Sequence, residues 1–210
     1  MKINQPLVEV LPGLLLASVV AIHAGAEAPK PLWQIGRPDG DNREFALAPS
    51  GHAQFREDGL FVVGESDAAR DWPYFQPGPL DAWAGGRSHT FTVVFGLKEA
   101  PPGEARLKVN LLDTHAAQPP EVEFRLNEAA VTRKLAAGAG DASIHGQPAK
   151  GKAQAFEITF PSGALKAGDN QLHITTRSGS WMLYDALVFE APAGAASAPV
   201  QSHTLISDVR

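Results

Sequence analysis

Apolar and polar residues alternate with a period of two along most of the middle of the chain. The clearest example is EVEFRL at 121–126, where Val122, Phe124 and Leu126 alternate with charged side chains. Because successive side chains of a strand point to opposite faces, this pattern predicts a strand with one buried and one wet face. The same alternation predicts further strands at 90–97, 106–111, 156–160 and 171–175.

The remaining pattern also favours strands over helices. Segment 182–189 is almost continuously apolar, as expected for a strand buried on both faces. No window keeps a helical period for more than two turns, and the nearest candidate, 128–137, runs into Gly138. Pro, Gly and Asn clusters separate the apolar runs at 101–103, 119–120, 161–163 and 168–170. Many short strands divided by regular turns predict an all-β fold, an antiparallel β-sandwich of jelly-roll type, with a polar loop at 136–151 over one edge.

The two ends of the chain depart from this pattern. A nine-residue apolar run at 14–22 is followed by AGA at 24–26, which is the small-x-small pattern that signal peptidase accepts. This run is too short to span a bilayer. We therefore expect residues 1–26 to be a signal peptide of an exported protein, periplasmic or secreted; a misassigned start codon or a buried strand is the alternative. The Ala/Pro/Ser-rich stretch 191–210 predicts a flexible tail, which leaves 31–190 as a single folded domain.

Composition narrows the classes of function. The chain carries 18 Lys and Arg against 23 Asp and Glu, a net charge of −5, with no basic block. Nucleic-acid binders show clustered Lys and Arg, so a nucleic-acid partner is not expected. The absence of Cys excludes disulfides, thiolate metal sites and Cys nucleophiles. Phosphate-binding, zinc-protease and dinucleotide motifs are absent, and GESDA at 64–68 falls one residue short of a nucleophile elbow, which disfavours an enzyme.

Aromatic and polar side chains concentrate in one Pro- and Gly-rich region, DWPYF followed by PGP and DAW. Saccharide sites combine aromatic planes, on which the C–H faces of sugars stack, with carboxylates and amides that bind hydroxyls, and Pro lowers the cost of ordering the loop. The region therefore predicts a ligand site that includes Asp71, Trp72, Tyr74 and Trp83. In the alternative, the tryptophans close one end of the core, because large aromatics dominate core packing.

Two further side chains are candidates for the same end of the sandwich. His89 opens one predicted strand, and Trp181 stands beside Gly179-Ser180 at the start of the last strand. A single histidine is more often a hydrogen-bonded structural residue than a ligand contact, and Trp181 has a core position as its alternative. Trp33 is predicted to belong to the core.

Three stretches carry more specific motifs: WQIGRPDGDNREF at 33–45, the segment from FVVGESDAARDWPYF to FTVVFGL at 61–97, and the closing half from EVEFRLNEA at 121–129 to LYDALVFE at 183–190. Together they resemble the C-terminal jelly-roll domain of rhamnogalacturonan lyases of polysaccharide lyase family four, a galactose-binding-like sandwich. The resemblance implies a carbohydrate-binding domain. The catalytic Lys and His of those lyases belong to another domain, so the resemblance assigns no catalytic residue to this chain.

Oxygen ligands cluster in RPDGDNRE, where Asp39, Asp41, Asn42 and Glu44 share a Gly-containing loop. This is the ligand type that calcium prefers, although the spacing is not that of an EF-hand. Galactose-binding-like modules often hold a structural calcium through an Asp of the final strand, and Asp185 stands there among apolar residues, where a carboxylate needs a partner. We therefore expect a candidate calcium site at Asp39, Asp41 and Asp185, with an Arg or a backbone N–H as the alternative partner of Asp185.

These observations predict a non-catalytic module that binds a pectin-type, rhamnogalacturonan-like or related polysaccharide outside the cytoplasm, with a carbohydrate-active enzyme as a candidate partner. The net charge of −5 favours neutral or rhamnose-rich segments over a strongly anionic backbone. Two alternatives remain: a polysaccharide lyase or accessory subunit acting on rhamnogalacturonan, and an extracellular protein-interaction domain.

Overall fold

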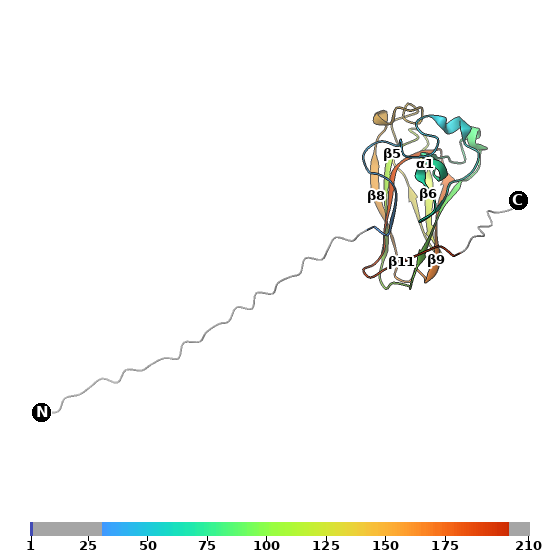
Figure 1. Ribbon diagram of the computed structural model, residues 1–210. Helices are drawn as coiled ribbons and strands as arrows, with labels where there is room; N and C mark the ends of the chain where they lie inside the picture. Colours follow the sequence, from blue (N-terminus) through green and yellow to red (C-terminus); the bar gives the residue numbers. More distant parts are fainter. Residues whose placement is uncertain (2–30, 202–210) are drawn as a thin grey trace.

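The structure is a computed structural model that describes residue 1 and residues 31–201. The predicted signal peptide lies, apart from Met1, outside the described residues. Two β-sheets form a sandwich, and the short helical segments gather toward one end of it (Figure 1). Within the described part of the chain, no helix is long and apolar enough to cross a membrane.

One sheet is built around the last long strand. Its strands pair antiparallel in the order β1-β10-β5-β8, and β3 pairs with the end of β10. The bounds are β1 (Trp33–Gly36), β3 (Phe75–Gln76), β5 (Ala105–Thr114), β8 (Gln154–Phe160) and β10 (Met182–Glu190).

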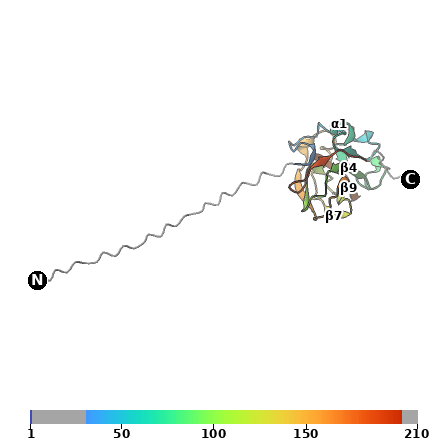
Figure 2. The same cartoon turned by 60° about the horizontal axis from the view of Figure 1, so that its bottom comes forward.

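The second sheet has the order β11-β4-β9-β6-β7, and β4, β9 and β7 are seen in one layer in Figure 2. All of these pairs are antiparallel, whereas β2 joins β4 in parallel. The bounds are β2 (Leu60–Val62), β4 (Thr90–Leu97), β6 (Glu121–Leu126), β7 (Ala129–Lys134), β9 (Gly168–Ser178) and β11 (Ser197–Ala198). The predicted all-β jelly-roll sandwich is confirmed.

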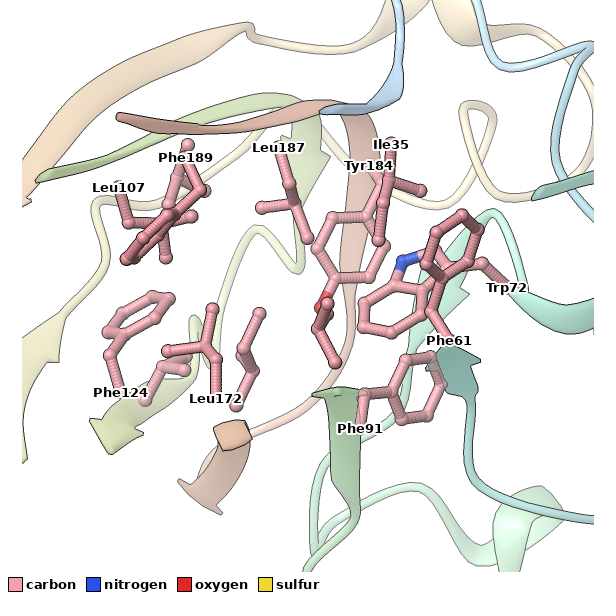
Figure 3. Close-up of a cluster of buried hydrophobic side chains, with 14 of the residues drawn as sticks. Ile35, Phe61, Trp72, Phe91, Leu107, Phe124, Leu172, Tyr184, Leu187 and Phe189 are labelled. Carbon is pink, nitrogen blue, oxygen red and sulfur yellow. The ribbon is translucent and has the colours of Figure 1, made fainter. Parts of the chain in front are cut away.

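The core fills the space between the sheets (Figure 3). The alternating residues of β6 are fully buried, as their period of two predicts, and nearly every residue of β10 is buried. Trp33 stacks on Phe189 with ring centroids 5.1 Å apart and is 5% exposed, which confirms its predicted core position. Burying apolar side chains of this size supplies most of the driving force for folding, at roughly 25 cal/mol per Å² of apolar surface.

Among the described residues, helical structure is limited to single turns at one end of the sandwich: η1 (Gly51–Gln54), α1 (Ala68–Asp71), η2 (Ala82–Ala84) and η3 (Pro148–Lys150). Segment 128–137, the nearest candidate for a helix in the sequence, instead contains β7, which pairs with β6 through a tight turn. Asn127 adopts a φ of 50° in this turn, a conformation that Asn tolerates better than most residues.

Two segments that were predicted to be a polar loop and a tail contain buried residues that their composition did not indicate. The polar segment 136–151 does not simply pass over an edge, because two of its own residues, Ser143 and Ile144, are buried. Within the predicted tail, β11 pairs with β4 and Val200 is buried, while residues 202–210 lie outside the described residues. Pro- and Ala-rich composition resembles that of a tail, but a short segment gains order when a neighbouring strand edge accepts its backbone hydrogen bonds.

Candidate functional site

Trp72 and Tyr74 are fully buried, which corrects the expectation that their rings face a ligand. The Trp72 ring lies 5.2 Å from the ring of Phe91 and 5.6 Å from that of Tyr184. The Tyr74 hydroxyl donates a 2.6 Å hydrogen bond to the Ile144 carbonyl, and burial raises the pKa of Tyr74. The chain turns inward after α1, and its next residues form β3 against β10, so these side chains join the core.

His89 and Trp181 are also inside the protein. His89 Nδ1 lies 2.5 Å from Asp58 Oδ1, and His89 Nε2 lies 3.0 Å from the Ala84 carbonyl. Burial raises the pKa of Asp58, but hydrogen bonds from His89 and the Thr90 N–H outweigh this effect and leave the pKa below its usual value. Trp181 is 3% exposed, with its ring beside His115. His89 and Trp181 therefore contact neighbouring loops inside the protein and do not face solvent.

Trp83 is the one exposed Trp, Tyr or Phe side chain in the part of the chain that the structure describes, at 39%. It lies on η2, and its ring packs edge-on against those of His52 and Phe75 at 5.4 Å. Asp81, the residue before η2, accepts hydrogen bonds from the Ser180 hydroxyl at 2.5 Å and the Gly78 N–H at 2.7 Å. Trp83 thus stands on an anchored loop with part of its ring open to ligand.

Two histidines that the sequence analysis did not single out extend this surface. The rings of His52 and His145 lie 4.8 Å apart, and His145 is exposed. Burial, and then the charge of His145, lowers the pKa of His52. Its neutral imidazole can both donate and accept a hydrogen bond. We call Trp83, His52 and His145 the aromatic patch; no sequence signal pairs the two histidines, because they come from distant loops.

Asp71, the remaining predicted ligand residue, lines a separate surface hollow of about 600 Å³ beside α1. Its carboxylate accepts two 2.8 Å hydrogen bonds from Arg70, which lower the pKa of Asp71. We call this space the α1 hollow. Its charged lining residues are Arg56, Glu57, Asp58, Glu65, Arg70 and Asp71, and Trp83 is not among the residues that line it.

The predicted calcium ligands lie around one loop. Carboxylate oxygens of Asp39, Asp41 and Glu44 all lie within 4.8 Å of one another, and Asp185 accepts a 3.1 Å hydrogen bond from the Gly40 N–H. Burial raises the pKa of Asp185, and the charges of Asp39 and Glu44 act in the same direction. We call residues 39–44 the acidic loop.

Other contacts of the acidic loop decide how well it fits a cation. Asp41 is paired with Arg43 at 2.7 Å, and Glu44 accepts the Arg37 N–H at 2.8 Å, so part of the negative charge is already engaged. The Asn42 side chain is fully buried, and neither its oxygen nor its nitrogen has a hydrogen-bond partner. Hard oxygen donors and an unsatisfied amide in one loop fit a hard cation such as calcium.

Comparison with known proteins identifies one family. The model of a family described as CBM-like, polysaccharide lyase family 4, domain III, matches residues 31–189. Among curated proteins no sequence matches this chain.

Solved structures with a similar arrangement share little sequence with the chain. A CBM35 from Cellvibrio japonicus Abf62 is 11% identical, with a TM-score of 0.38, and the match covers 70% of this chain and 91% of that one. A family 35 carbohydrate binding module from an environmental isolate is 14% identical, with a TM-score of 0.36 and coverage of 81% and 100%. A family GH115 4-O-methyl-alpha-glucuronidase with specificity for decorated arabinogalactans is 13% identical, with a TM-score of 0.34 and coverage of 80% and 19%.

Proposed function

The chain belongs to the CBM-like family of polysaccharide lyase family 4, domain III, and from that premise we propose that it is a non-catalytic carbohydrate-binding module of an exported protein. The observation that carries the proposal is the aromatic patch, in which Trp83 is exposed on an anchored loop, His52 packs against Trp83, and His145 packs against His52. The ligand we propose is a pectin-type, rhamnogalacturonan-like polysaccharide, bound through neutral or rhamnose-rich units because the protein carries a net charge of −5.

The chemistry of the aromatic patch suits a sugar ring. The C–H face of a pyranose can stack on the open part of the Trp83 indole, while hydroxyl groups at the ring edge exchange hydrogen bonds with His52 and His145. The edge-on contact with His52 and Phe75 restricts motion of the indole before ligand arrives. Less freedom is then lost on binding.

Replacing Trp83 with Ala is expected to weaken polysaccharide binding by about tenfold or more, because an aromatic stacking contact is worth about 1–3 kcal/mol. The melting temperature should change little, since Trp83 lies at the surface and is 39% exposed. Affinity electrophoresis and calorimetry on rhamnogalacturonan and galactan measure the first effect, and thermal unfolding of the same samples measures the second. Leu80→Ala is the matched control, because Leu80 is an exposed apolar residue of the same loop. Undiminished binding by Trp83→Ala would remove the aromatic patch from the proposal.

The two alternatives give different results in the same samples. A lyase would release products with unsaturated ends that absorb in the ultraviolet, and wild-type protein should release none. A protein-interaction domain would bind no polysaccharide and would co-purify with a protein instead. Export is tested separately by the N-terminal sequence of the mature protein, which we expect to lack residues 1–26. A carbohydrate-active enzyme remains the partner that we propose.

We also propose that the acidic loop and Asp185 of β10 together hold a structural calcium ion, through Asp39, Asp41, Glu44 and Asp185. Millimolar calcium should raise the melting temperature and chelator should reverse the rise, because a ligand that binds only the folded state stabilises it by about 2.7 kcal/mol at a concentration of 100 Kd. The Asp39→Asn variant should lose this response. Asp141→Asn, which changes an exposed carboxylate in another loop, should keep it. Identical melting curves of wild-type protein with calcium and with chelator would count against the ion.

A further inference from the structure

The α1 hollow has walls that hydrogen bonds hold in place. On one side, Asp58 accepts a 3.1 Å hydrogen bond from the Thr90 N–H and contacts the His89 ring. On the other side, the Ala46 N–H donates to the carbonyls of Ala68 and Trp72, at 2.9 and 3.0 Å, and ties the chain to α1. The hollow therefore has its shape before any ligand binds.

Backbone strain marks the rim of the same hollow. Leu47, one of its lining residues, has a φ of 64°, and outside glycine the only other described residue with positive φ is Asn127. A leucine pays a steric cost in this conformation, because its Cβ approaches backbone atoms, whereas Asn adopts it readily. Strained residues of this kind concentrate at binding and catalytic sites.

The lining of the hollow offers paired donors and acceptors. Arg70 and Asp71 are fixed against each other by two 2.8 Å hydrogen bonds, and each keeps further hydrogen-bonding capacity. The Arg56 guanidinium is also oriented, by hydrogen bonds to the carbonyls of Ala53 and Phe55. A fixed guanidinium beside fixed carboxylates matches adjacent hydroxyl groups, which accept from the first and donate to the second.

The balance of charge selects the class of ligand. Two guanidinium groups stand against four carboxylates in the lining, and Leu60, 40% exposed, adds an apolar edge. An anionic sugar such as a uronate would meet net repulsion there, whereas a neutral one would not. We propose that the α1 hollow is a second binding site, separate from the aromatic patch, for a neutral sugar unit of the polysaccharide. This proposal rests on the proposed carbohydrate-binding function. It adds that the same module has a second site and that this site binds neutral sugars.

The test follows backbone amide and arginine side-chain resonances of the full chain during titration with two probes. These are a neutral galactotetraose from β-1,4-galactan and a tetragalacturonate. The neutral probe is expected to shift signals of Arg56, Glu65 and Arg70, and to do so in Trp83→Ala as well as in wild-type protein. Asp71→Asn should weaken the binding measured at these signals by about tenfold, as expected for loss of a hydrogen bond to a charged group. Glu99→Gln, at an exposed position outside the hollow, is the control.

The outcomes separate this inference from the proposed function. Shifts confined to Trp83, His52 and His145 would overturn the second site and leave carbohydrate binding by the aromatic patch intact. Equal binding of tetragalacturonate at the hollow would overturn the assignment to neutral sugars. If neither probe shifts any signal, both this inference and the proposed function fail.

Discussion

Replacing Trp72 with Ala is expected to lower the free energy of unfolding by about 3–5 kcal/mol, the usual cost of removing a fully buried large aromatic. The Trp72 indole is 0% exposed and packs against the rings of Phe61, Phe91 and Tyr184. Its loss leaves a cavity between the two sheets that rigid neighbours cannot fill. Because the indole nitrogen has no hydrogen-bond partner, the predicted loss comes from packing alone.

Urea unfolding of Trp72→Ala beside Trp83→Ala measures this difference directly. Both variants remove a tryptophan from the same stretch of sequence, but only Trp72 is buried. We expect a large loss of stability in the first variant and less than about 1 kcal/mol in the second, as for most surface substitutions. A stable Trp72→Ala that no longer binds polysaccharide would instead place Trp72 at the ligand site and contradict the packing described above.

The contrast between Trp72 and Trp83 shows what the sequence could predict and what it could not. Strands were predictable because alternation in segments such as 121–126 is a local property, set by which side chains share a face of the sheet. The burial of a loop aromatic is not local, because it depends on where the chain turns after α1. Both DWPYF and DAW therefore have a composition typical of saccharide-binding loops, yet Trp72 is buried in the core and Trp83 is exposed.

The same reasoning applies to the rest of the candidate site. The acidic loop was recognisable because Asp39, Asp41 and Glu44 are close in sequence and remain close in space. The contact of His52 with His145 was not, because it requires the long segment 136–152 to fold back over η1. A buried carboxylate, Asp113, makes three of the hydrogen bonds that hold that segment in place.

Asp113 is fully buried at the end of β5 and holds the loop that carries His145. Its carboxylate accepts hydrogen bonds from the N–H groups of Ala139 and Lys152, at 2.9 and 3.1 Å, and from the Ser143 hydroxyl at 2.6 Å. The loop also fits tightly at Gly138, where an added Cβ would lie 1.8 Å from the Thr114 carbonyl oxygen. The position of His145 beside His52 therefore depends on these interactions.

Replacing Asp113 with Ala is expected to cost about 3 kcal/mol or more of stability, because each buried donor left without a partner costs about 1–3 kcal/mol. Asp113→Asn should cost less, since its amide oxygen can still accept from the N–H groups of Ala139 and Lys152, which share one carboxylate oxygen, whereas its NH₂ group cannot accept from the Ser143 hydroxyl. Urea unfolding measures both losses, and Asp141→Asn, an exposed carboxylate of the same loop, is the control that should leave stability unchanged. Under conditions where Asp113→Asn stays folded, the resonances of His145 should shift, because the loop that carries it has moved. The affinity for polysaccharide should also fall, although the fraction of folded protein is unchanged. Wild-type stability and an unshifted His145 in this variant would show that other contacts, and not the Asp113 carboxylate, place the loop at the aromatic patch.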